Sequence, residues 1–89
     1  MKSDTKSKLN KIFNYYGFRK QYHKLIEEMA ELIQAIEKEE SKDSIIEEMA
    51  DVQILLMQIR LNLNSTDSSK FVKFFNEKID RQIERIENK

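Results

Sequence analysis

The chain has 89 residues, of which 16 are basic and 16 acidic, with one glycine, no proline and no cysteine. This length predicts a single domain over residues 1–89, and the scarcity of glycine and proline beside 36% charged residues predicts an all-α fold. The balanced charge argues against nucleic acid as a partner, and the lack of cysteine excludes disulfides, thiolate zinc sites and cysteine nucleophiles.

The first half of the chain predicts two helices. One covers residues 4–16 and ends at Gly17, because glycine commonly terminates helices. The other covers residues 18–40 and is followed by a polar turn over residues 41–43. Its apolar residues recur three and four positions apart, as one face of a helix requires. We expect this stripe to face the core: Tyr22, Leu25, Ile26, Met29, Leu32, Ile33 and Ile36.

The second half predicts two more helices and an interface. Ser44 followed by Glu47 is a capping-box pattern, which predicts a third helix from there to residue 63. Between Val52 and Leu63 its apolar residues cover almost the whole circumference, which in a small protein is typical of a subunit interface. After a polar loop at residues 64–69, a fourth helix is expected to turn these residues inward: Phe71, Phe74, Phe75, Ile79, Ile83 and Ile86. The sequence thus predicts an all-α four-helix bundle completed by homo-oligomerisation, as a homodimer or homotetramer.

An acidic octapeptide occurs twice in the predicted second and third helices. Residues 25–32 read LIEEMAEL and residues 45–52 read IIEEMADV. Each copy sets two acidic residues three positions apart, on one face of a helix: Glu28 with Glu31, and Glu48 with Asp51. If the helices pack together, four carboxylates converge and repel unless a divalent cation lies among them. All-oxygen ligands suit Mg²⁺ best, with Mn²⁺ also possible. The alternative is an ordinary solvated acidic surface.

The remaining polar residues suggest how such a metal site would be used. The chain has no Ser-His-Asp or Cys-His set and no glycine-rich phosphate loop, so direct attack by water is the simplest chemistry. Glu27 or Glu47, one step around the helix from the ligands, could orient or deprotonate that water. Gln21 and Lys24 share the helix side of Glu28 and are candidates for substrate contact.

Two further groups of residues have simpler interpretations. His23, the only histidine, is expected to point away from the carboxylates, at the surface or an interface. The aromatic residues near the first turn could stack on a base, but packing in the core is favoured for them: Phe13, Tyr15, Tyr16 and Phe18. The chain has no apolar run that could span a bilayer and no apolar signal core, so a cytoplasmic location without a membrane partner is expected.

The acidic pattern Glu27-Glu28-x-x-Glu31, a short spacer and Glu48-x-x-Asp51 resembles that of the MazG-like all-α nucleoside triphosphate pyrophosphohydrolases. The Tyr16-Gly17 segment with Gln21, and Lys78-x-x-Arg81 near the end, are similar to small single-domain members.

The resemblance implies hydrolysis of a nucleoside triphosphate between the α and β phosphates, which releases the monophosphate and pyrophosphate. It also implies roles for individual residues, with Mg²⁺ held by Glu28, Glu31, Glu48 and Asp51, and phosphates contacted by Lys78 and Arg81. The alternatives are a dUTP- or phosphoribosyl-ATP-specific relative, or a non-catalytic oligomerisation or regulatory module.

Overall fold

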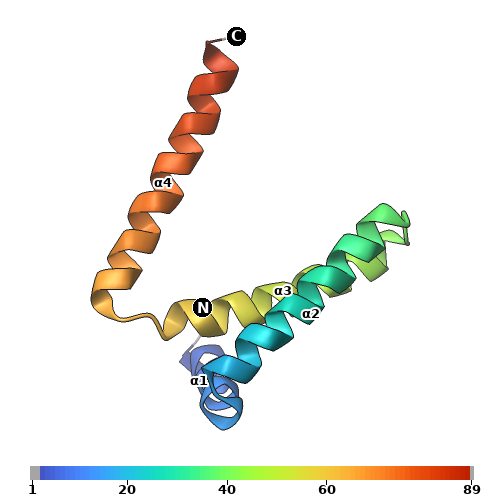
Figure 1. Cartoon of the computed structure of the whole chain (residues 1–89), viewed down its shortest axis with the longest axis vertical. Coiled ribbons are helices and arrows are strands. Elements are labelled where there is room, and N and C mark those ends of the chain that lie inside the picture. Colours follow the sequence, from blue (N-terminus) through green and yellow to red (C-terminus); the bar gives the residue numbers. More distant parts are fainter. Residues whose placement is uncertain (1–2, 89) are drawn as a thin grey trace.

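The computed structural model describes residues 3–88 and contains four helices joined by short connections (Figure 1). In chain order they are α1 (Ser3–Tyr16), α2 (Phe18–Glu37), α3 (Lys42–Leu61) and α4 (Ser65–Glu87). No strand occurs among the described residues, so the predicted all-α class is confirmed. None of the helices over residues 3–88 is long and apolar enough to cross a lipid bilayer.

The connections on either side of α2 depend on left-handed backbone conformations. Gly17 has a φ of 86° between α1 and α2, a value that costs glycine little and other residues more. Glu39 has a φ of 52° in the turn between α2 and α3. Three amides of that turn donate back to α2, from Lys38 to the Gln34 carbonyl at 2.9 Å, from Glu39 to the Ile36 carbonyl at 3.1 Å and from Glu40 to the Ala35 carbonyl at 3.0 Å. These bonds fold the chain back sharply, so that α3 returns along α2.

The starts of α3 and α4 lie earlier than the sequence predicted. Ser41, and not Ser44, is the N-cap of α3, because the Ser41 hydroxyl accepts a hydrogen bond from the Ser44 amide at 3.2 Å. Asn64 caps α4 in the same way and accepts from the Asp67 amide at 2.8 Å. The polar composition at 64–69 therefore belongs to a cap and a first helical turn, and the predicted loop there is wrong.

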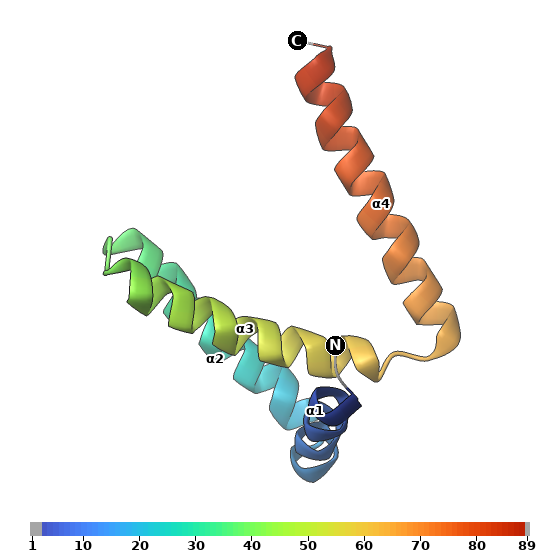
Figure 2. The ribbon, with the colours of Figure 1, turned by 180° about the vertical axis from the view of Figure 1, so that it is seen from behind.

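The core lies between α2 and α3, which run antiparallel along most of their length (Figures 1 and 2). Leu25 of α2 packs with Val52 and Leu55 of α3, and Leu32 and Ile59 pack partly buried against this cluster. Helix α1 contacts both of these helices, at the end of the pair where α2 begins. The core is small, which fits the limited buried surface expected for a chain of this length.

Helix α4 diverges from the other three helices in both views (Figures 1 and 2). Its one prominent link is a cation–π contact, in which the Arg60 guanidinium lies 4.5 Å from the centre of the Phe71 ring. No residue of α4 is buried, so the expectation that its apolar residues face inward is wrong within one chain. The radius of gyration is 15.8 Å, against about 12 Å for a compact chain of this length. The chain is therefore not a closed four-helix bundle.

The predicted inward face of α2 is also wrong. Only Leu25 of that apolar stripe is buried and Leu32 is half-buried, whereas the other five residues are between 39% and 60% exposed. Helix α2 instead turns a neighbouring stripe toward α3: Gln21, Leu25, Glu28, Leu32 and Ala35. The accessible surface totals 7593 Å². A folded monomer of this mass is expected to expose about 5,500 Å².

Candidate functional site

The pairing of α2 with α3 brings the two octapeptides face to face. Gln21 of α2 meets Gln58 of α3, and seven residues further along α2 Glu28 lies near Asp51, which is seven residues back along α3. This constant register follows from two straight helices running in opposite directions from a tight turn. Because side chains seven residues apart share one face of a helix, the register directs Gln21 and Glu28 toward the same side of the pair.

Three of the four predicted metal ligands converge at this point. Glu28, Glu48 and Asp51 each offer a carboxylate oxygen, and these oxygens all lie within 4.8 Å of one another. Opposite ligands of Mg²⁺ are separated by about 4.2 Å, twice the usual Mg–O distance, so a slight contraction would bring the three oxygens onto one ion. Glu28 is 8% exposed, Glu48 is half-buried and Asp51 faces solvent. The cluster is open on one side, as a site that admits substrate must be.

Two oxygens of this cluster lack a partner. Glu28 Oε2 and Glu48 Oε2 are buried and have no hydrogen bond. An unsatisfied buried polar group costs about 1–3 kcal/mol, and more when it is charged, so such atoms need a partner. A divalent cation bound by oxygen atoms supplies one, and the donor set consists only of carboxylates. These residues therefore fit Mg²⁺ or Mn²⁺, and they lack the nitrogen and sulfur donors that favour zinc.

Glu31, the fourth predicted ligand, lies beside the cluster but outside the group of converging oxygens. Hydrogen bonding to the Glu28 carboxyl, with repulsion by its charge, raises the pKa of Glu31, and burial and the Glu48 charge add to the effect. Glu31 thus senses the other carboxylates. It lies on the exposed side of α2.

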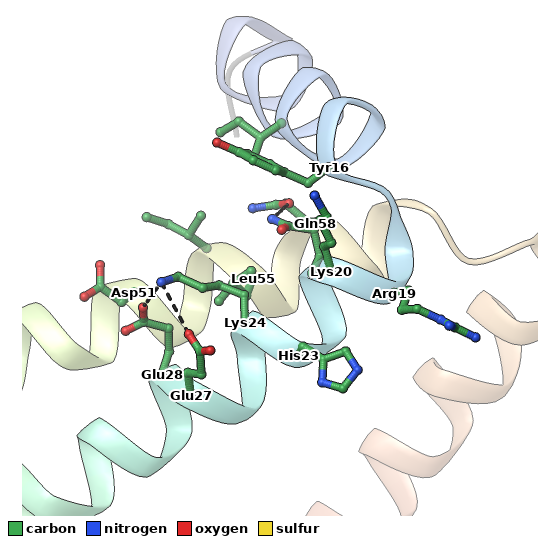
Figure 3. Close-up of a pocket in the computed structure, with 13 residues that line it drawn as sticks. Tyr16, Arg19, Lys20, His23, Lys24, Glu27, Glu28, Asp51, Leu55 and Gln58 are labelled. Carbon is green, nitrogen blue, oxygen red and sulfur yellow. Dashed lines mark hydrogen bonds and ion pairs between the residues drawn. The ribbon is translucent and has the colours of Figure 1, made fainter.

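Lys24 supplies the counter-charge nearest to the cluster (Figure 3). Its ammonium nitrogen lies 3.3 Å from Glu28 Oε1 and 3.6 Å from Glu27 Oε2. The hydrogen bond to Glu28 and the attraction of both carboxylates raise the pKa of Lys24. Glu27 lies at the same place, one step around α2 from Glu28. Glu47 is exposed and does not line the pocket that adjoins these residues, so the structure brings only Glu27 of the two candidate bases there.

A pocket of about 760 Å³ adjoins the carboxylates, and it is lined by residues from the end of α1, the first half of α2 and α3 (Figure 3). Predicted site residues that line it are Gln21, Lys24, Glu27, Glu28 and Asp51. Lys78 and Arg81 do not, since they lie on α4. His23, expected to point away from the site, lies on its edge. The favoured core role of the aromatic residues is wrong for Tyr15, Tyr16 and Phe18, which are exposed, and Tyr16 lines the pocket.

Three residues that were not predicted as site residues also line the pocket: Arg19, Lys20 and Gln58. Gln58 is 1% exposed, and its Oε1 accepts a hydrogen bond of 2.9 Å from Nε2 of Gln21. One signal was present, because Gln58 interrupts the apolar segment of α3 seven residues after Asp51, on the same side of the helix. Arg19 and Lys20 had no such signal, since surface cations are common on any helix.

The site combines carboxylates able to hold a divalent cation with a neighbouring pocket that lysine and arginine line. In a helical protein, this arrangement is suited to binding a phosphate ester through a metal ion. A family model for the MazG nucleotide pyrophosphohydrolase domain matches residues 18–88, and the chain belongs to this family. No curated protein and no solved structure matches the chain.

Proposed function

We propose that this protein is a Mg²⁺-dependent nucleoside triphosphate pyrophosphohydrolase, which converts a (deoxy)nucleoside triphosphate and water to the monophosphate and pyrophosphate. The observation that carries the proposal is the cluster of Glu28, Glu48 and Asp51, in which two buried oxygens have no partner, at the edge of a pocket that Arg19, Lys20 and Lys24 also line. Membership of a family described by this activity supports the same conclusion.

In the reaction, a water oxygen bonds to the α-phosphorus while the bond from this phosphorus to the α–β bridging oxygen breaks, and pyrophosphate leaves. A bound Mg²⁺ supplies charge neutralisation for the triphosphate and for its leaving group. Glu27 is the residue best placed to orient the water and accept its proton, because it lines the pocket and has an exposed carboxylate. The ammonium group of Lys24, between Glu27 and Glu28, adds positive charge beside the phosphates.

The proposal includes a homo-oligomer, at least a homodimer. The exposed surface of one chain exceeds that expected for a folded monomer of its size by roughly 2,000 Å², an area typical of one partner's share in an obligate interface. Apolar residues of α2 and α4 account for much of it, including Ile26 and Ile33 of α2 and Ile79 and Ile83 of α4. Two such stripes bury each other only when chains associate.

Helix α4 brings basic residues to such an association. At about 100° per residue, Lys70, Lys78, Arg81 and Arg85 fall along one edge of its apolar stripe, with Asp67 among them. Packing this edge of α4 beside the pocket of another chain would carry Lys78 and Arg81 of the partner subunit toward the phosphates, where these predicted residues would act.

The catalytic part is tested by measuring pyrophosphate and monophosphate release from a panel of ribo- and deoxyribonucleoside triphosphates with Mg²⁺. Wild-type protein should turn over at least one of them. Glu28→Gln and Asp51→Asn should each lose at least about 100-fold in kcat/KM, since each removes a proposed metal ligand. Glu37→Gln, at the exposed end of α2 away from the pocket, is the matched control and should retain activity. Absence of turnover by wild-type protein across the panel would support the non-catalytic module instead.

The oligomer is tested by sedimentation equilibrium of the full chain. Ile79→Gln/Ile83→Gln should raise the dissociation constant by at least 100-fold, because burying each isoleucine contributes about 1.5–3 kcal/mol. Asp80→Gln/Glu84→Gln introduces the same residue twice on the opposite side of α4 and should leave the dissociation constant nearly unchanged. A wild-type protein that sediments as a monomer at all accessible concentrations would contradict this part of the proposal.

A further inference from the structure

The pocket contains a buried pair of amides that the hydrolytic chemistry does not use. Gln21 and Gln58 are 6% and 1% exposed, lie on different helices and share one hydrogen bond of 2.9 Å. Both line the pocket. Among the described residues, no hydrogen bond is found for the other two amide atoms of the pair, Gln21 Oε1 and Gln58 Nε2. Because both side chains line the pocket, these two atoms are available to a ligand bound there.

A pair of this kind always presents one donor and one acceptor. With Gln21 donating to Gln58, the free groups are a carbonyl oxygen on Gln21 and an amino group on Gln58. If both amide groups rotate by 180°, their mutual hydrogen bond is kept with donor and acceptor reversed. The free group on Gln21 is then the amino group and the free group on Gln58 is the carbonyl oxygen. The pair can thus match an adjacent N–H and C=O, as in uracil or guanine, and also an adjacent ring nitrogen and amino group, as in cytosine or adenine.

The distance of the pair from the carboxylates suits the two ends of one nucleotide. Gln21 precedes Glu28 by seven residues and Gln58 follows Asp51 by seven, so along both helices the separation is about 10 Å. This is the order of length that separates the α-phosphate from the far edge of the base in an extended nucleotide. Between the two ends the pocket has apolar walls, which include Leu55, and on the α1 side it has the partly exposed ring of Tyr16 (Figure 3).

We propose that the Gln21–Gln58 amide pair binds the hydrogen-bonding edge of the substrate's nucleobase. The pair then requires a base edge that carries no blocking substituent, but it accepts either order of donor and acceptor along that edge. This inference rests on the proposed function for the identity of the ligand, because a nucleotide is what that function supplies. It makes Gln21 and Gln58 specificity-determining residues, whereas a purely structural pair would only fix the register of α2 against α3.

The test compares UTP with its N3-methyl derivative, in which the edge N–H is replaced by a methyl group. In wild-type protein with Mg²⁺, kcat/KM should be roughly 10-fold or more lower for the methylated nucleotide, since a site that hydrogen-bonds a group rejects an analogue lacking it. In Gln21→Met/Gln58→Met, which keeps the side-chain length and leaves no polar partner stranded, the two substrates should react equally.

Two controls separate base recognition from other effects. Gln53→Met is the same exchange on α3 outside the pocket, and it should keep the wild-type ratio between the two substrates. Methyl triphosphate has no base, so its kcat/KM should be alike in all three proteins. A register-fixing role would instead lower the melting temperature of the double variant and leave the wild-type protein indifferent to N3-methylation.

The same comparison is made by calorimetry with UMP and N3-methyl-UMP in the presence of Mg²⁺. Tighter binding of UMP by at least 10-fold supports the inference even if wild-type protein turns over no triphosphate, an outcome that would overturn the proposed function alone. Equal kcat/KM and equal binding for the two nucleotides in wild-type protein would overturn the inference and leave the proposed function standing. Neither of these measurements depends on whether the double variant folds.

Discussion

Replacing Glu48 by glutamine removes one of the three negative charges whose oxygens lie within 4.8 Å of one another. At an effective dielectric constant of about 20, two unit charges at that separation repel by about 3.5 kcal/mol. The net gain is smaller, because Asp51 is exposed and Lys24 already offsets part of the charge of Glu28. The substitution also gives a buried, unpartnered oxygen position an amide donor. We therefore expect Glu48→Gln to stabilise the metal-free protein by at least about 1 kcal/mol, which raises Tm by roughly 4–8 °C.

The same variant should lose its response to magnesium. For wild-type protein, Mg²⁺ at 100 times its Kd adds about 2.7 kcal/mol, whereas the variant lacks one ligand and should gain far less. Thermal unfolding followed by circular dichroism, with chelator and with Mg²⁺, measures both effects. Glu47→Gln is the matched control, since the neighbouring side chain is exposed and outside the cluster, and it should change neither value much. The reasoning is refuted if Glu48→Gln leaves the metal-free Tm unchanged or lower and still responds to Mg²⁺ as wild type does.

Three further outcomes are expected. Hydrogen bonding to Glu28 and repulsion by its charge raise the pKa of Glu31, so the folded state binds the Glu31 proton more tightly than the unfolded state does. The free energy of unfolding of the metal-free protein should therefore fall as the pH rises from the ordinary pKa of 4.5 through the raised one. Glu31→Gln should flatten this pH dependence in urea titrations. Lys24→Met should lower the metal-free Tm, because a mostly buried carboxylate loses its cation, whereas Lys11→Met on α1 should not; equal Tm values would speak against the ion pair. Leu55→Ala should cost about 2–5 kcal/mol of unfolding free energy by urea denaturation, and a loss below 1 kcal/mol would show that the core lies elsewhere.

The pairing of carboxylates on each helix was predictable because it depends only on the spacing of residues close together in the sequence. A spacing of three residues places Glu28 beside Glu31 and Glu48 beside Asp51 on any helix, and the repeated octapeptide gives both helices the same arrangement. The contact between Gln21 and Gln58 was not predictable in this way, since it joins residues 37 positions apart and depends on the register of the α2–α3 pair. A polar residue on the buried side of a helix signals that something is paired there, but it does not identify the partner.

The burial of α2 and α4 shows a different limit. Periodicity identifies the apolar sides of a helix. Both helices have more apolar surface than the other helices of the same chain cover. In α2 the chain covers the stripe containing Leu25, where α3 packs, and leaves Ile26 and Ile33 exposed. In α4 it buries no residue. The hydrophobic pattern identifies these apolar stripes, but it does not state whether the same chain or another one covers them.

The helix starts show how neighbouring residues compete for one role. Ser41 and Ser44 are both able to cap a helix, and the pattern of Ser44 with Glu47 favoured the second. In the fold the Ser44 hydroxyl donates to the Glu40 carboxylate at 2.6 Å, while Ser41 takes the cap position. The choice depends on where the preceding turn ends, because the left-handed residue Glu39 reverses the chain just before Ser41.

That reversal has a consequence for the spacing of the two octapeptides. The helices α2 and α3 are joined by only the four residues 38–41, so the length of this connection fixes which residues of α3 lie opposite which residues of α2. The meeting of Glu28 with Asp51 thus depends on a turn several helical turns away. Lengthening that turn would shift one helix along the other and separate the acidic side chains, without altering any group that touches the ion.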